Sequence, residues 1–210
     1  MILILDYGIG NLLSIERAIN KFNKNTKISN KKSDFIEASH LILPGVGSFG
    51  FAMKNISEKS LLDPIVKFAN SGKAIMGTCL GMQLLLSSSN EFGSNQGLNL
   101  IEGKVISLKE LDRENKNFKL PHIGWKKFEK NVDHKTNKLL KDINQSDEFY
   151  YVHSYFSNTR ERKNNLAYCK FYSYSFPCII NKDNIYGVQF HPEKSGNSGL
   201  KLLKNFLDIK

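Results

Sequence analysis

Apolar residues in the first half of the chain follow two alternating patterns. Short continuous apolar runs at Ile2–Leu5, His40–Leu43 and 74–76 are typical of strands buried on both faces of a parallel sheet. Between them, residues 12–22 and 61–71 carry apolar side chains at helical spacing, which predicts amphipathic helices. This alternation predicts an α/β fold whose mostly parallel sheet has helices on both faces.

Two further segments complete this expected sheet. A polar stretch holds an edge strand near residues 26–28, and residues 197–209 form a closing amphipathic helix. The second half otherwise contains short strand-like runs, which we expect to add antiparallel strands on the far side of the sheet. These runs are residues 104–108, 122–128, 148–156, 166–174, 178–181 and 185–190. At 210 residues, we expect one domain spanning residues 1–210.

Composition narrows the class of protein. Hydrophobic residues make up 40% and charged residues 24%, and no apolar run is long enough to span a bilayer. Met1 leads directly into an apolar run without a basic segment, which favours a first strand over a signal peptide. The three cysteines, Cys79, Cys169 and Cys178, lack metal-ligand spacing, so we expect no disulfide framework, no metal site and a reducing cytoplasm.

The formal net charge of +10 raises the possibility of nucleic-acid binding. The lysines, however, are interleaved with acidic residues and asparagines along the whole chain. A nucleic-acid footprint clusters on one face, so solvated surfaces are the better interpretation. Such a basic surface also suits docking of an acidic partner protein.

Cys79 lies where the period changes from strand to helix. Gly77 and Gly81 flank it at two residues on either side, as in the cysteine version of a nucleophile elbow. Small neighbours let the backbone turn sharply and expose the side chain, and the following helix N-terminus favours thiolate. The alternative is a buried cysteine that acts as a small apolar residue, the usual fate of a free cysteine.

Two glycine-rich turns follow predicted strands. Gly8-Ile9-Gly10 lacks the third glycine and the distant acidic residue of a dinucleotide-binding fingerprint, so we reject that function. Residues 44–50 hold three glycines, and their N–H groups could approach a ligand closely, although an ordinary turn is the alternative. Ligands on parallel sheets bind at the carboxyl ends of strands, where this loop and Cys79 both lie.

His191-Pro192-Glu193 ends the last predicted strand. On that strand Gly187, Gln189 and His191 share one face. A carboxylate at Glu193 can accept the Nδ1 proton of His191 and leave Nε2 free as a base. Cysteine, histidine and an orienting acid together make an activated nucleophile, whereas a lone histidine of this kind would be a surface residue.

These segments resemble class I (triad) glutamine amidotransferases. The matching segments occur in the same order along nearly the whole chain. Within this family, the chain most resembles the glutaminase subunits of imidazole glycerol phosphate synthase. The resemblance is carried by Gly77-Thr78-Cys79-Leu80-Gly81-Met82-Gln83, Gly187-Val188-Gln189-Phe190-His191-Pro192-Glu193, Asp6-Tyr7-Gly8-Ile9-Gly10-Asn11, Leu43-Pro44-Gly45-Val46-Gly47, Pro121-His122-Ile123-Gly124-Trp125 and Val152-His153-Ser154-Tyr155.

The resemblance implies a catalytic mechanism and a set of site residues. Cys79 attacks the side-chain amide of L-glutamine, His191 transfers the proton and Glu193 orients His191. Backbone N–H groups of Leu80, Val46 and Gly47 hold the oxyanion. The residues implied to bind the α-amino and α-carboxylate groups of glutamine are Gln83, Glu91, His153, Ser154 and Tyr155.

The resemblance also implies a partner. No cofactor is expected, and the ammonia passes to a separate synthase (cyclase) subunit in a heterodimer. Thr78 and Lys126 depart from the residues usual in the family, an aliphatic residue and Asn. Because Lys126 lies near the implied partner-facing surface, a sugar amidotransferase of surface-polysaccharide synthesis stays open as the alternative partner. A γ-glutamyl hydrolase and a basic nucleic-acid-binding protein are the remaining alternatives.

Overall fold

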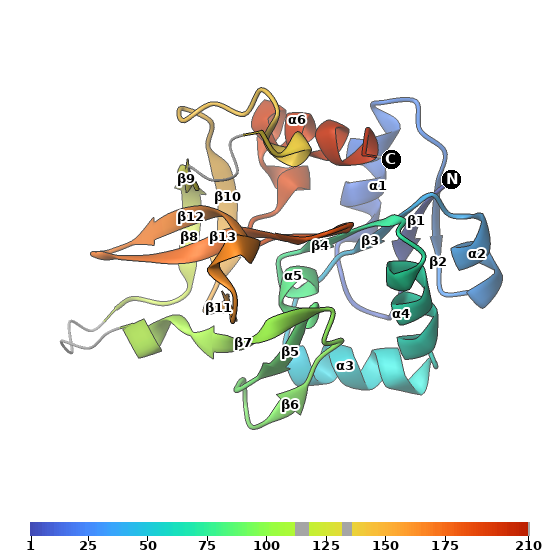
Figure 1. The fold of residues 1–210 in the computed structure, drawn as a ribbon, viewed down its shortest axis with the longest axis horizontal. Coiled ribbons are helices and arrows are strands. Elements are labelled where there is room, and N and C mark those ends of the chain that lie inside the picture. The colour runs from blue at the N-terminus through green and yellow to red at the C-terminus, as the bar shows by residue number, and fades with distance from the viewer. Residues whose placement is uncertain (112–117, 132–135, 210) are drawn as a thin grey trace.

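The computed structural model describes residues 1–111, 118–131 and 136–209. An eight-stranded sheet forms its centre (Figure 1). Its strands are, in spatial order, β2 (Thr26–Ser29), β1 (Ile2–Leu5), β3 (His40–Leu43), β4 (Ala74–Thr78), β14 (Ile185–Val188), β13 (Tyr174–Lys182), β12 (Asn165–Phe171) and β9 (Phe128–Lys130). The strands from β2 to β14 pair in parallel, and β13, β12 and β9 add antiparallel. The predicted α/β class with an antiparallel addition is confirmed.

Helices cover both faces of this sheet because the parallel strands are apolar on both faces. Ile2 and Ile4 of β1 pack in one cluster with α1 (Leu12–Asn20) and α6 (Gly196–Leu207). Leu3 and Leu5 pack on the opposite face with α3 (Phe49–Glu58) and α4 (Leu62–Asn70). Figure 1 shows α1 and α6 together on one side of the sheet and α3 and α4 on the other. Neither β1 face is exposed to water, as the continuous apolar run predicts.

Two smaller sheets stand beside the central one. β10 (Phe149–His153) pairs with β8 (His122–Lys126), and the other sheet has the order β11 (Tyr155–Thr159), β7 (Ile101–Ser107), β5 (Leu86–Ser89) and β6 (Asn95–Gln96). Short 3₁₀ turns join several strands: η1 (Leu108–Leu111), η3 (Lys138–Leu140), η4 (Arg162–Asn164) and η5 (Pro192–Lys194). The run at 148–156, predicted as one strand, is therefore two strands in different sheets.

Other expectations need correction. The last strand, β14, joins the parallel part of the sheet instead of the antiparallel addition. Apolar residues after Cys79 continue at helical spacing as far as Leu86, which predicts a longer helix, but α5 spans only Leu80–Leu84 and Leu86 already belongs to β5. All five residues of α5 are buried, so an apolar stripe could not reveal where this helix ends.

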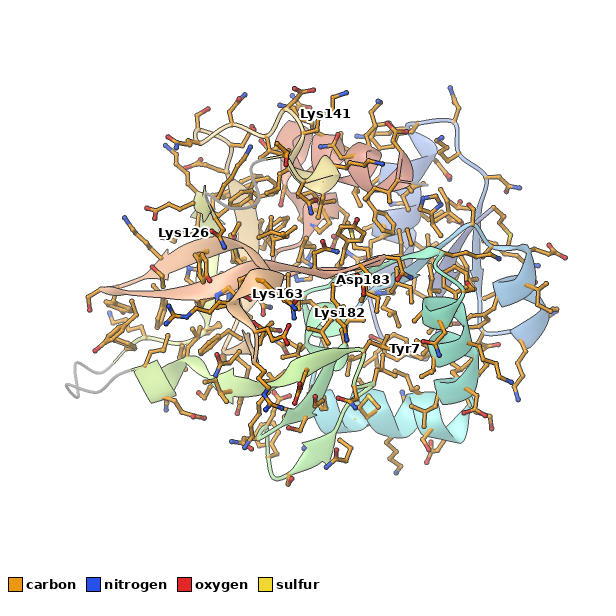
Figure 2. The ribbon with its side chains drawn as sticks, viewed as in Figure 1. Tyr7, Lys126, Lys141, Lys163, Lys182 and Asp183 are labelled. Carbon is orange, nitrogen blue, oxygen red and sulfur yellow. The ribbon has the colours of Figure 1, made fainter. Side chains whose placement is uncertain are left out.

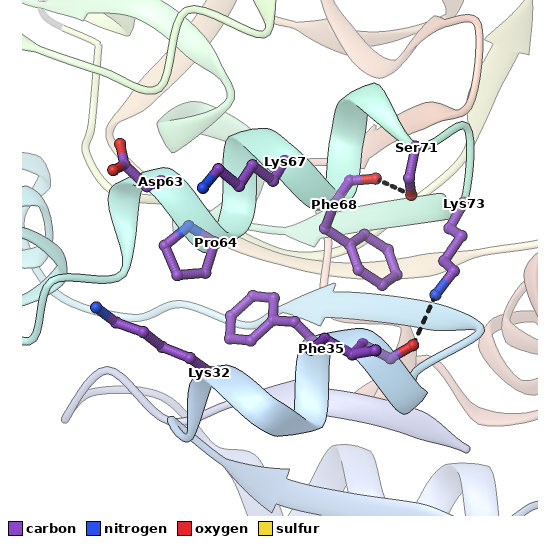
Figure 3. A pocket seen from close by; sticks show the side chains of 9 residues that line it. Lys32, Phe35, Asp63, Pro64, Lys67, Phe68, Ser71 and Lys73 are labelled. Carbon is purple, nitrogen blue, oxygen red and sulfur yellow. Dashed lines mark hydrogen bonds between the residues drawn. The ribbon is translucent and has the colours of Figure 1, made fainter.

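Two helices were missed, α3 and the six-residue α2 (Lys32–Glu37). α2 packs on α4 at the edge of the molecule, where the rings of Phe35 and Phe68 meet edge to face with centroids 6.4 Å apart (Figure 3). Lys73 Nζ donates a hydrogen bond to the carbonyl of Ile36 across this contact, at 3.0 Å. None of the helices in the described ranges has the length and apolar character needed to cross a membrane.

The basic side chains are distributed over separate elements. Lys126 lies on β8, Lys163 in the turn η4 and Lys182 on β13, and Figure 2 shows them apart from Lys141, which follows η3. Several lysines are further paired with carboxylates, as Lys170 is with Glu129 at 2.8 Å. This distribution matches the interleaved charges of the sequence.

Candidate active site

Cys79 occupies a sharp turn between β4 and α5. Its backbone has φ +52° and ψ −111°, a conformation that non-glycine residues rarely adopt. The amide of Cys79 donates to the carbonyl of Val188 at 2.8 Å, which ties the turn to the end of β14. Backbone strain of this kind persists only where the surrounding structure enforces it, and it collects at functional sites.

Gly77 and Gly81 permit this turn by allowing close approach of the backbone. A Cβ atom on Gly81 would lie 1.8 Å from the carbonyl oxygen of Leu43 in β3, and one on Gly77 would lie 2.4 Å from the carbonyl oxygen of Gly81. The sequence prediction that small residues flank the turn is correct. The unusual φ, however, belongs to Cys79 itself.

His191 follows β14 and is held from both sides. Its Nδ1 lies 3.0 Å from Oε1 of Glu193 in the turn η5. Its amide donates to the carbonyl of Tyr150 at 2.9 Å, and Ser195 Oγ donates to its carbonyl at 2.6 Å. Nε2 of His191 is buried and has no hydrogen-bond partner in the described part of the chain. This nitrogen is therefore available to exchange a proton.

Electrostatic interactions favour the protonated imidazole of His191. Burial alone lowers its pKa, but interactions with Cys79 and Glu193 outweigh burial and raise the pKa to about 10. An imidazolium next to a sulfur atom stabilises the thiolate, which is the nucleophilic form of cysteine. The three side chains can thus form an ion pair backed by a carboxylate.

A cavity of about 490 Å³ opens over Cys79, within the range of small-molecule sites. It gathers segments that are far apart in the sequence and includes every predicted site residue except Glu193, which lies behind His191. The lining residues are Val46, Gly47, Cys79, Leu80, Gln83, Glu91, Phe92, Pro121, Val152, His153, Ser154, Tyr155 and His191.

Several of the residues predicted to bind glutamine already make hydrogen bonds within the chain. Gln83 uses its Nε2 within the chain, donating to the carbonyl of Tyr155 at 2.9 Å. Glu91 Oε2 accepts from the amide of Phe49 at 2.6 Å, and burial raises the pKa of this carboxyl. Both ring nitrogens of His153 have partners, Tyr155 O and His122 Nδ1. The His153 side chain therefore supports the cavity wall instead of offering a free polar group.

The loop predicted to hold the oxyanion packs directly on the turn that carries Cys79. A Cβ on Gly45 would lie 2.7 Å from the amide nitrogen of Gly81, so only glycine fits here. Gly47 has φ +94°, and no hydrogen bond in the described ranges uses the amide of Val46 or Gly47. These two amides and that of Leu80, the first residue of α5, border the cavity without an assigned role in the fold.

Sequence reasoning missed several residues at the site. Val152 presents its carbonyl 3.9 Å from Cys79 Sγ, and Gln189 places its Nε2 3.8 Å from the same atom. The signal for Gln189 was present, because strand alternation puts it on the same face as His191. The pairing of His122 with His153 gave no local signal, because the two residues are 31 positions apart.

Comparisons with known proteins agree with this geometry. The family model "Glutamine amidotransferase class-I" matches residues 3–209. Imidazole glycerol phosphate synthase subunit HisH 1 of Methanococcus maripaludis is 42% identical over 212 residues, covering 100% of both chains. Subunit HisH of Sulfurimonas denitrificans is 42% identical over 206 residues, covering 98% of this chain and 97% of its own. Subunit HisH 1 of Legionella pneumophila (strain Lens) is 39% identical over 208 residues, covering 98% of each.

Solved structures share the fold at lower identity. The crystal structure of a glutamine amidotransferase superposes with a TM-score of 0.73 at 17% identity, covering 98% of this chain and 97% of that one. The structure of PurLQS from Thermotoga maritima gives a TM-score of 0.68 at 15% identity, covering 99% and 97%. The chain belongs to the class I glutamine amidotransferase family, and within it to the HisH subunits of imidazole glycerol phosphate synthase.

Proposed function

We propose that this chain hydrolyses L-glutamine at Cys79 and passes the ammonia to a separate cyclase subunit that makes imidazole glycerol phosphate in histidine biosynthesis. One observation carries the proposal: Cys79 is held in a strained turn beside His191, whose Nδ1 is bound to the buried Glu193. The names of the relatives support the choice of synthase. The free thiols of all three cysteines support a reducing cytoplasm.

The proposed reaction runs in two stages. The Cys79 thiolate attacks the side-chain amide carbon of glutamine, and the carbonyl oxygen becomes an oxyanion facing the amides of Leu80, Val46 and Gly47. The His191 imidazolium gives its Nε2 proton to the departing nitrogen, so that ammonia leaves and a thioester remains. Neutral His191 then takes a proton from water, which attacks the thioester and releases glutamate and the thiolate.

The partner follows from the chemistry of ammonia. Free ammonia is mostly protonated in neutral water and is then no nucleophile, so it must reach its acceptor without mixing with solvent. We propose that the cyclase docks over the strand ends around the cavity, as one member of a heterodimer. Docking would order the loop at Val46 and Gly47, whose amides make no hydrogen bonds in the described chain, and so raise glutaminase turnover.

The test is glutamate release from glutamine by the purified chain, first alone, then with the cyclase subunit, and then with the cyclase and its ligand. We expect turnover to rise at each addition. Cys79→Ser is expected to remove turnover while the variant stays folded, because a hydroxyl is far less nucleophilic at neutral pH. Substantial activity in folded Cys79→Ser would exclude Cys79 as the nucleophile. A turnover that is already high for the chain alone, and does not change when the cyclase or its ligand is added, would exclude the proposed partner.

A further inference from the structure

A line of buried amides leads away from Cys79. Nε2 of Gln189 lies 3.8 Å from Cys79 Sγ, and Oε1 of Gln189 accepts from Nε2 of Gln83 at 3.2 Å. Nε2 of Gln83 also donates to the carbonyl of Tyr155 at 2.9 Å. Gln189 is completely excluded from solvent and Gln83 is only 5% exposed, so both amides depend on partners within the chain. The nucleophile thus belongs to a buried polar network.

Two histidines continue this network on the far side of Tyr155. His153 Nδ1 lies 2.7 Å from the Tyr155 carbonyl, and His153 Nε2 lies 3.0 Å from His122 Nδ1. Burial lowers the pKa of His153 to about 3 and that of His122 to about 4, so both rings are neutral at physiological pH. A carbonyl oxygen only accepts, so His153 carries its proton on Nδ1 and His122 must donate to Nε2.

The direction of these hydrogen bonds determines how Gln189 is oriented. The Tyr155 carbonyl requires a donor from Gln83, so Gln83 must present its amide nitrogen. Gln189 then has to accept with its oxygen, which leaves its amide nitrogen facing Cys79. A flipped Gln189 would place two amide nitrogens against each other and a carbonyl oxygen against the sulfur. The network therefore specifies an N–H donor at Sγ.

On the basis of the proposed glutaminase function, we propose that Gln189 is a further catalytic residue, whose amide N–H stabilises negative charge on Cys79 Sγ. Gln83 and the His122–His153 pair act as positioning residues that hold this amide in its donating orientation. The Gln189 N–H group acts at two steps of the reaction. It stabilises the attacking thiolate, and it stabilises the thiolate again when the C–S bond of the thioester breaks and the electron pair returns to sulfur.

The experiment measures alkylation of Cys79 by iodoacetamide as a function of pH, in the absence of glutamine. Gln189→Met keeps the volume but removes the donor, and Gln96→Met is a matched control at an exposed site. Cys79→Ser gives the background from the buried Cys169 and Cys178. The ionisable groups that interact with Cys79 are His191 and Tyr7, with Glu193 behind His191, and every variant in this experiment keeps these three groups.

We expect the midpoint of alkylation in Gln189→Met to move up by about one pH unit, a roughly tenfold loss of thiolate. The Gln96→Met profile should match that of the wild type. In glutamine hydrolysis, kcat should fall about tenfold with little change in KM, because Gln189 does not line the cavity. An unchanged alkylation midpoint in folded Gln189→Met overturns the proposal, even if the melting temperature is lower.

Two variants of His122 test whether the His122–His153 pair positions the Gln189 amide. His122→Phe fits the aromatic surroundings of Tyr151, Phe171 and Phe176 but removes the N–H, whereas His122→Asn returns an N–H near the position of Nδ1. We expect a smaller upward shift of the midpoint in His122→Phe and its reversal in His122→Asn. Equal midpoints in these two variants overturn the positioning role. Because alkylation needs no glutamine, failure of this inference is distinguishable from failure of the glutaminase assignment.

Discussion

Nδ1 of His191 lies 3.0 Å from Oε1 of Glu193, and the two side chains are only 3% and 1% exposed. The other carboxyl oxygen, Oε2 of Glu193, is buried and has no hydrogen-bond partner in the described residues. His191 is thus the hydrogen-bond donor that faces this carboxyl, and a buried carboxylate is costly without such a partner. The pair therefore holds the imidazole in position and, together with Cys79, favours its charged form.

Glu193→Gln tests this relationship. The amide keeps the shape but cannot supply a negative charge, so the pKa of His191 should fall below about 10. The alkaline limb of the activity profile should then move to lower pH by about one to two pH units, which steady-state rates between about pH 6 and 11 measure. We expect kcat to fall about 10²-fold, less than in Cys79→Ser, because the acid is not consumed in the reaction. Wild-type rates and pH dependence would mean that Glu193 has no catalytic role.

Gly81→Ala should destabilise the chain strongly. Its Cβ would lie 1.8 Å from the carbonyl oxygen of Leu43, a backbone atom in the central sheet, so β3 or the Cys79 turn must move. We expect a loss of more than about 3 kcal/mol in the free energy of unfolding, measured by urea denaturation. Gly72→Ala is the control, because Gly72 has φ +79° with nothing near its Cβ and should cost about 1–2 kcal/mol. Equal losses in both variants would show that the turn tolerates a side chain.

The buried histidine pair should make stability depend on pH. The pKa of His122 is about 4 and that of His153 about 3, below the ordinary value of 6.5, so the unfolded chain binds more protons in this window. The free energy of unfolding should therefore fall as pH decreases from 6.5 towards 4, by up to about 1.4 kcal/mol per pH unit for each histidine. His191 acts oppositely: its raised pKa stabilises the fold below pH 6.5, and that contribution is lost as pH rises towards 10.

His122→Phe isolates one part of this effect. Removing the His122 ring should flatten the pH dependence between pH 6.5 and 4 relative to the wild type, while carboxylates that titrate in both proteins cancel in the difference. Urea denaturation at several pH values across this window gives the two slopes. Parallel slopes would mean that His122 accepts a proton in the folded state as readily as in the unfolded chain.

The sequence was sufficient for the parts of the fold that local patterns encode. Continuous apolar runs located β1, β3 and β4, and the glycines around Cys79 located the turn between β4 and α5. The helix α3 was missed although Phe49, Ala52 and Ile56 form its buried face. Its first two residues lie in the glycine-rich segment 44–50, which was interpreted as a loop. The six-residue α2 is too short for a periodic pattern to emerge.

Pairing between distant segments could not be predicted in this way. The run at 148–156 has one continuous strand pattern, yet β10 pairs with β8 and β11 pairs with β7. That change of sheet at Ser154 places Val152 to Tyr155 on the cavity wall. The His122–His153 and Gln83–Gln189 contacts join residues 31 and 106 positions apart, and a single sequence carries no local signal for either.

The surface beside the cavity has the composition of a docking site. Ile123 is 56% exposed and Trp125 is 49% exposed, both on β8, and Lys126 and Lys127 border the groove next to Trp125. Pro121, immediately before β8, lines the cavity itself. Large exposed apolar side chains ringed by charge are typical of protein interfaces, and the lysines favour an acidic partner surface.

Trp125→Ala should therefore weaken binding of the cyclase subunit. Tryptophan is enriched among the residues that dominate interface energies, and we expect a loss of about 2 kcal/mol, roughly a 30-fold rise in Kd. Isothermal titration with the cyclase measures it, and Ile36→Ala is the control, because Ile36 is 80% exposed on α2 at the opposite edge of the sheet. The lysines should speed association with an acidic partner surface. Association should therefore be slower at high ionic strength, in the wild type and in both variants. If Trp125→Ala binds as tightly as Ile36→Ala, the Trp125 side chain does not contribute to binding of the cyclase.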